Sequence, residues 1–204
     1  MITSILTGDI INSRNSTQTE AWITSLKEIL NSYGNAPKSW ETYRGDSFQL
    51  EVPNPEESLT AALKIKAVIK QHKNLDVRIG IGIGEITYRA NKITESNGPA
   101  FTNSGDCFES LRLNTLAIKT PWEDINYQIN IMISLASLTI DNWTPTKSTN
   151  VKASLLFPEK NQKELAILLN KKSQSTISQS LKSAGMDEIN QMLAFFRNAI
   201  KSKL

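Results

Sequence analysis

The stretch from residue 77 to 86, Val-Arg-Ile-Gly-Ile-Gly-Ile-Gly-Glu-Ile, alternates strictly between branched apolar residues and glycine or charged residues. Because successive side chains of a strand point to opposite faces, this period of two predicts a β-strand with one packed face and one bare face. Glycine weakens a strand, so we expect the bare face to let a ligand or another backbone approach closely. The glycines lie within the strand and no helix follows at once, so they do not form a nucleotide-binding glycine loop.

Patterns on either side of this strand predict a mixed body of strands and helices. Further strands are expected where β-branched residues lie between turn-forming residues, at residues 2–11, 39–43, 47–52 and 115–119. Helices are expected where apolar residues recur at helical spacing, over residues 17–34, 56–72, 100–113 and 125–136. The order strand, helix, strand, strand, helix, strand predicts an α+β fold, with a ferredoxin-like or palm-like sheet and helices on one face.

The chain after residue 143 has the pattern of helices alone, over residues 147–157, 162–169, 173–184 and 187–201. Since Trp143-Thr144-Pro145 ends the preceding helix, we predict a body, residues 1–143, and an all-helical domain, residues 144–204. Residues 151–204 carry 9 Lys and Arg against 4 Asp and Glu, whereas residues 1–150 carry 14 against 16. This excess predicts that the helical domain meets a polyanion such as DNA; the alternative is a solvated basic tail.

The cysteine and histidine contents limit the chemistry that one chain can host. The single cysteine, Cys107, excludes an internal disulfide framework, and the single histidine, His72, excludes a His-rich or Cys-rich zinc site. Any metal must therefore use oxygen ligands. The apolar N-terminus, residues 1–11, contains Asp9 and has no basic region before it, so it reads as neither a signal peptide nor a membrane span. We expect a cytoplasmic protein without a membrane partner.

Two Gly-Asp steps, Gly8-Asp9 and Gly45-Asp46, each lie beside a strand-like run. Neighbouring strands would place the two carboxylates side by side, as Mg²⁺ or Mn²⁺ requires for chemistry on nucleotide phosphates. Asp9 and Asp46 are therefore candidate metal ligands. The alternative is a structural role, because Asp beside Gly at a strand end also forms turns.

The basic C-terminal part contains a segment, residues 162–181, that resembles a bacterial helix-turn-helix. Ala166 fits a close helix crossing, Asn170 can adopt the left-handed turn, and Ile177 with Leu181 would be buried. Residues 161–184 are thus expected to bind DNA, although the turn is one residue longer than in most such motifs and the alternative is a merely structural helix pair. Short polar side chains would reach base edges, from Ser173, Gln174, Ser175, Thr176, Ser178 and Gln179. Lysines would contact phosphates, from Lys171, Lys172 and Lys182.

The body resembles the catalytic domain of class III nucleotide cyclases, which has a palm-like fold. The matching segments are Gly8-Asp9-Ile10, Gly45-Asp46-Ser47-Phe48 and the strand at 77–86. The resemblance implies that the two aspartates hold divalent ions, which bind a triphosphate and activate the ribose hydroxyl in sites shared across a homodimer. The residues implied or available for nucleotide contact are Ile10, Arg44, Gly45, Ser47, Arg78 and Asn103.

Two parts of the cyclase apparatus are missing from this sequence. Glu41-Thr42-Tyr43 stands where the family has its base-recognising lysine, and residues 97–111 contain no Arg or Lys. Asn103 can stand in for the family's asparagine, but Arg112 is poorly placed for its arginine. An arginine at the transferring group is worth about 10³ to 10⁵ in rate, so its loss predicts binding with little turnover. Arg44 and Arg78 could supply charge from new positions; the alternative is that each is a solvated or salt-bridged surface residue.

Over its whole length the chain is similar to the SatD family, a bacterial family. The similarity rests on the Gly-Asp-Ile start, the segment 45–49, the segment 97–101 and the helix-turn-helix. We expect a DNA-binding regulator of transcription, in which a degenerate cyclase-like domain binds nucleotide and metal and dimerises. The alternative is an active Mg-dependent nucleotidyl cyclase or transferase with a C-terminal helical module that binds DNA or another partner.

Overall fold

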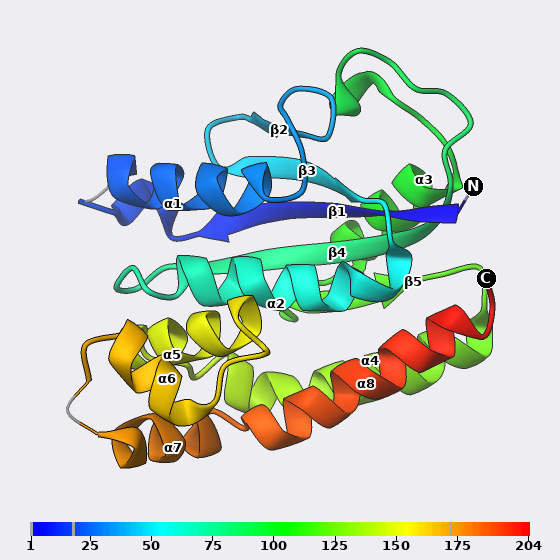
Figure 1. Ribbon diagram of the computed structural model, residues 1–204. Coiled ribbons are helices and arrows are strands. Elements are labelled where there is room, and N and C mark those ends of the chain that lie inside the picture. The colour runs from blue at the N-terminus through cyan, green and yellow to red at the C-terminus, as the bar shows by residue number, and fades with distance from the viewer. Residues whose placement is uncertain (1, 18, 172) are drawn as a thin grey trace.

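The computed structural model describes residues 2–17, 19–171 and 173–204, which form an α+β structure with a five-stranded mixed sheet (Figure 1). Its strands lie in the order β2-β3-β1-β4-β5, all neighbours being antiparallel except the parallel pair β4 and β5. Their bounds are β1 (Ile2–Ile11), β2 (Trp40–Tyr43), β3 (Ser47–Val52), β4 (Asp76–Glu85) and β5 (Leu116–Lys119). Every predicted strand is present, with ends within a residue of those predicted.

Eight α-helices lie within the described ranges, and each predicted helix is among them. Their bounds are α1 (Thr19–Asn31), α2 (Ser58–Ile69), α3 (Pro99–Ser110), α4 (Glu123–Ile140), α5 (Pro145–Leu156), α6 (Gln162–Leu168), α7 (Gln174–Ser183) and α8 (Met186–Lys201). In these ranges we find no helix that combines the length and the apolar character needed to cross a membrane.

Helix α2 lies in the middle of the molecule, between the sheet and the C-terminal helices (Figure 1). It packs on β4 and α1 on one side and on α5 and α8 on the other, so 11 of its 12 residues are buried. The apolar residues of β4 face α2 and belong to one large core, which extends from Leu6 to Ile200. The body and the helical part therefore share a core, and the division at residue 143 stays a prediction.

The glycine face of β4 is covered by α3, which packs backbone against backbone. A Cβ atom on Gly80 would lie 2.5 Å from the backbone nitrogen of Phe108, and one on Gly84 would lie 2.7 Å from that of Ala100. Of the two alternatives for the bare face, the approach of another backbone is confirmed. The prediction that all helices cover one face of the sheet was wrong. Helix α3 packs on the glycine face of β4, opposite the face that contacts α2.

Two asparagines of α4 bind the open edge of β5 as a further strand would. The Asn130 amide accepts from Ile118 N at 2.9 Å and donates to Ile118 O at 2.8 Å. Asn126 makes the same pair of bonds with Thr120, at 2.7 and 2.9 Å. Since an exposed strand edge leaves backbone groups unpaired, these amides satisfy the edge and fix the rotation of α4 about its axis.

Candidate functional site

Asp9 and Arg78 form an ion pair at the end of β1. They stand opposite each other in the antiparallel register of β1 and β4. Arg78 donates from Nε to Asp9 Oδ1 at 2.9 Å and from Nη2 to Oδ2 at 2.5 Å, and its guanidinium lies 5.4 Å from the Phe108 ring centre. The hydrogen bonds to Asp9 raise the pKa of Arg78 above its ordinary value. Both oxygens of Asp9 are thereby engaged.

The β2–β3 hairpin brings Asp46 to the same end of β1. Arg44 (φ 53°) and Gly45 (φ 90°) are left-handed in its turn, where glycine is favoured. The Asp46 carbonyl accepts from Ile10 N at 3.0 Å, and its Oδ2 accepts from Ser13 Oγ at 2.6 Å. The turn thus fixes the Asp46 carboxylate beside the chain that follows Asp9.

Asp9 and Asp46 line one pocket of about 550 Å³, which we call the aspartate pocket. Its walls also carry three guanidinium groups, from Arg14, Arg78 and Arg112. Three cations against two carboxylates leave a net positive charge at this end of the sheet. Charge-assisted hydrogen bonds from arginine suit a phosphate, which guanidinium binds through two parallel bonds. The pocket is therefore suited to an anion.

Arg112 reaches the aspartate pocket because the chain turns sharply after α3. Its backbone is left-handed (φ 50°), as is that of Asn12 (φ 63°), which also lines the pocket. Such conformations cost about 1–3 kcal/mol each in a residue that is not glycine, and they cluster at binding sites. Arg112 therefore lines the pocket, through a turn that a spacing count along the chain does not register, and its poor placement for the role of the cyclase arginine stays a prediction.

The donor set of the aspartate pocket does not fit a bare divalent ion as it is arranged here. Arg78 occupies both oxygens of Asp9, and Ser13 occupies one of Asp46. Within residues 2–17, 19–171 and 173–204, no group of three or more His, Cys, Asp and Glu side chains could hold a metal ion. A Mg²⁺ ion can be held by one or two carboxylates when substrate phosphates complete its shell. It would require Arg78 to release Asp9.

The other residues expected to contact nucleotide lie at differing distances from the pocket. Ile10 lines it, and Ser47 lies beside it opposite Asp9 in the β1–β3 register. Arg44 and Gly45 are exposed at the hairpin tip. Asn103 is elsewhere, since its Nδ2 donates to Ile83 O at 2.8 Å and ties α3 to β4. Ile10 and Arg78 thus line the pocket with the aspartates, whereas Arg44, Gly45, Ser47 and Asn103 are not among its lining residues.

Helices α6 and α7 pack together, with the residue environments predicted for the helix-turn-helix segment. Ala166, Ile177 and Leu181 are buried. Asn170 is left-handed (φ 51°), and the following Lys171 N donates to Ala166 O at 2.8 Å, which closes the end of α6. The burial and the turn were therefore predicted correctly from the sequence.

The outer surface of α7 carries the polar side chains proposed to read DNA. Ser178 is half-buried, and Lys171 in the turn is exposed. The other side chains of this set are exposed: Ser173, Gln174, Ser175, Thr176, Gln179 and Lys182. Lys172 lies outside the described residues. Hydroxyl groups pair locally at the start of α7, where Ser173 Oγ lies 2.8 Å from Ser175 Oγ. Two further lysines, Lys160 and Lys163, line a groove together with Gln174 and Lys182, and the sequence reasoning missed them.

A comparison with protein families finds one family, described as the SatD family, whose model matches residues 3–198. The match therefore includes the sheet, the aspartate pocket, α6 and α7. No curated protein matches the chain.

Proposed function

Because the chain belongs to the SatD family, we propose a single function for the body and helical part together, that of a bacterial DNA-binding regulator whose body binds a nucleotide phosphate. The observation that carries the proposal is the α6–α7 pair, with Ile177 and Leu181 buried beneath an exposed polar surface. Helix α7 contains no Asp or Glu, so no carboxylate of that helix would repel DNA phosphates. In this geometry the start of α7 contacts base edges in the major groove.

Lysines around α7 supply the phosphate contacts of this proposal. Lys171 precedes α7, Lys182 lies in its last turn, and Lys160 and Lys163 lie across the groove beside it. Each lysine that neutralises a DNA phosphate releases a counterion, so binding weakens as salt rises. The predicted contact from Lys172 is part of the same proposal.

The nucleotide part of the proposal rests on the aspartate pocket. Support for a palm-like or ferredoxin-like body comes from the chain order β1-α1-β2-β3-α2-β4 and the neighbour order β2-β3-β1-β4. Asp9 lies near the end of β1 and Asp46 in the hairpin turn before β3, and both line this pocket, which supports the paired role that the resemblance to cyclases implies. Arg14, Arg78 and Arg112 supply the positive charge that nucleotide phosphates need.

A second candidate is a Mg-dependent nucleotidyl cyclase or transferase, which the convergence of Asp9 and Asp46 on one pocket favours. In that function the metal would supply charge stabilisation at the phosphates, and Asp9 would have to exchange Arg78 for the ion. Incubation with each nucleoside triphosphate and Mg²⁺ or Mn²⁺, followed by chromatography, distinguishes the two candidates. A cyclic or transferred product supports the second.

Fluorescence anisotropy with DNA from upstream of the protein's own operon tests the DNA proposal. We expect binding at low salt and a log–log salt slope that Lys171→Gln reduces by about 1. Lys27→Gln is the matched control, because Lys27 is an exposed lysine on α1, away from α6 and α7. Absence of binding at low salt, or equal slopes for the two variants, would count against a DNA interface at α7.

A further inference from the structure

Helix α4 has an outer surface unlike that of an ordinary solvent-exposed helix. Residues 125–140 contain no charged side chain. Large apolar residues nevertheless stand in solvent, with exposed fractions of 73% for Tyr127, 45% for Ile131, 65% for Leu135 and 74% for Leu138. They are spaced by four, four and three residues, so they form a ridge along one side of the helix. Depletion of charge around exposed apolar residues is typical of the centre of a protein interface.

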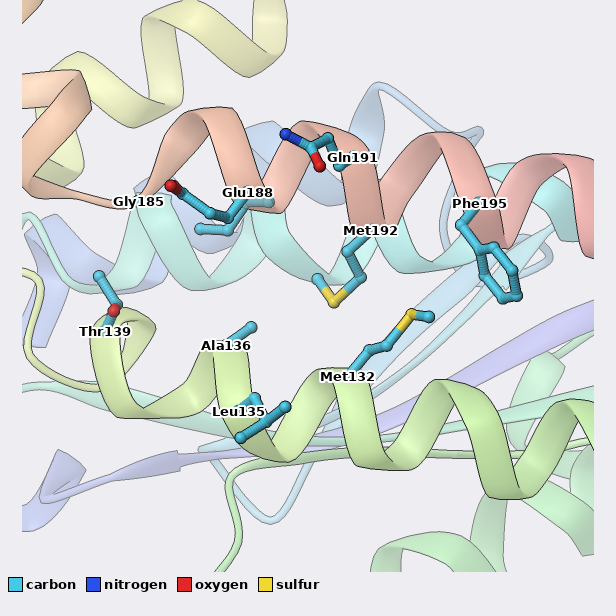
Figure 2. A pocket seen from close by; sticks show the side chains of 10 residues that line it. Met132, Leu135, Ala136, Thr139, Gly185, Glu188, Gln191, Met192 and Phe195 are labelled. Carbon is cyan, nitrogen blue, oxygen red and sulfur yellow. The ribbon is translucent and has the colours of Figure 1, made fainter.

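A groove of about 610 Å³ runs beside this ridge, between α4 and α8 (Figure 2). Its floor is apolar, with Met132 and Met192 pointing toward one another and Phe195 at one end. Gly185 and Thr139 lie at the opposite end. Methionine side chains adapt readily to a partner's shape. Since Asn126 and Asn130 fix α4 on β5, the helix cannot turn its ridge inward.

We propose that a second copy of this chain covers the surface formed by α4 and α8, so that two copies form a twofold-symmetric dimer. A twofold interface must be self-complementary, because each patch meets its own copy. The ridge and the groove lie side by side on α4, so the ridge of one copy can enter the groove of the other. The result is an antiparallel four-helix contact, in which helices pack closely around apolar residues.

The charged side chains at the two ends of the α4–α8 surface are mainly acidic. Glu188 lines the groove, while Lys203 pairs with Asp124 at 3.2 Å outside it, where α4 begins. Glu123 and Asp124 begin α4, and Asp187 and Glu188 begin α8, so acidic groups stand at both ends of the surface. Those groups disfavour an anionic lipid surface as the partner.

The exposed apolar area is sufficient for a stable pair. At roughly 200 Å² for a large apolar residue, the exposed parts of the four ridge residues and Phe195 amount to about 600 Å². A standard interface buries about 800 Å² on each partner, which the surrounding polar rim can complete. A monomer leaves so large an apolar patch uncovered only at the upper end of the usual range. This proposal does not depend on the DNA or nucleotide proposals.

Sedimentation equilibrium on the full chain tests the dimer. We expect the wild-type protein to be dimeric at about 20 μM, and Leu135→Glu and Leu138→Lys each to weaken association at least about 100-fold. Because both side chains are mostly exposed, the variants should fold, which far-UV circular dichroism checks. Ile167→Glu is the matched control: Ile167 is 69% exposed on α6, and its variant should stay dimeric.

Thermal unfolding gives a second measurement. The melting temperature of a dimer rises with protein concentration, so that dependence should be present in the wild type and in Ile167→Glu and lost in both ridge variants. A wild-type chain that stays monomeric at about 100 μM overturns the proposal. It does so also if vesicles or another protein are found to bind the ridge. Dimers that both ridge variants leave intact overturn it equally.

Discussion

Two ion-pair clusters flank Val77 on β4, and they differ in burial far more than in chemistry. Asp76 accepts from Lys66 at 2.8 Å and from Lys70 at 2.9 Å, and these lysine side chains are 1% and 6% exposed. Two residues further on, Arg78 holds Asp9 while 37% exposed. In the first cluster both lysines are buried and Asp76 is 15% exposed, whereas the second cluster opens into the aspartate pocket. A buried charge must keep its partner, whereas an accessible one can exchange it for a ligand.

The buried cluster acts as a clamp between the sheet and the helical layer. Lys66 also contacts Asp141, which follows α4, at 3.0 Å, and Thr115 Oγ1 at 2.9 Å. Lys70 donates to the Asp141 carbonyl at 2.8 Å. Helix α2, strand β4 and the end of α4 are therefore joined through two ammonium groups whose hydrogen bonds are well supplied. Such completeness is what makes buried charge tolerable.

The largest effect is expected from removing charge at the clamp. Asp76→Asn leaves two buried lysines with one carboxylate fewer, which should lower the free energy of unfolding by about 3–5 kcal/mol. Asp9→Asn is the same chemical change at the open pair and should cost no more than about 1 kcal/mol. Urea unfolding of both variants measures the difference. Equal losses would mean that burial does not separate the two clusters.

An intermediate effect is expected at Arg78, on ligand binding rather than on stability. Arg78→Gln removes a charged donor from the aspartate pocket, worth about 1.5–3 kcal/mol to a bound phosphate, so nucleotide affinity should fall roughly 10- to 100-fold. Titration calorimetry measures it, with Arg89→Gln as control because Arg89 pairs with Glu51 outside the pocket.

The same Arg78→Gln variant also separates the two candidate functions. If Arg78 merely shields Asp9, the variant should retain its nucleotide affinity or gain a Mg²⁺-dependent component. That outcome would favour the metal-dependent candidate over phosphate binding by the arginines.

The difference between the clusters also shows what sequence patterns can predict here. The alternating strand, the hairpin turn at Gly45-Asp46 and the buried residues of α6 and α7 depend on local spacing, so they were predictable. Lys66 and Lys70 recur at i and i+4 like a solvated helix surface, and their burial follows only from the packing of α5 and α8 on α2. Arg14 and Arg112 reach the aspartate pocket through turns with a left-handed residue, at Asn12 and at Arg112 itself. The spacing of residues along the sequence does not predict such turns.

The smallest effect is expected at a third ion pair, which is at least as exposed as that of Arg78 and Asp9. Arg197 of α8 holds Glu57, just before α2, at 2.6 and 3.1 Å, and the two side chains are 35% and 39% exposed. Arg197→Met should therefore lower the free energy of unfolding by no more than about 1 kcal/mol at neutral pH. Lys64→Met is a useful control, because Lys64 lies near the pair without bonding Glu57.

This loss should depend on pH in a defined direction. The hydrogen bond from Arg197 is the largest cause that lowers the pKa of Glu57, so the folded protein holds this proton less tightly than the unfolded chain. The stabilisation is therefore complete above the unfolded pKa of about 4.3 and disappears as pH falls through the lower folded value. Urea unfolding of wild type and Arg197→Met at several pH values should show their difference vanish in acid. If the difference persists in acid, the effect of Arg197 comes from the packing of its aliphatic side-chain carbons on α2 and not from its charge.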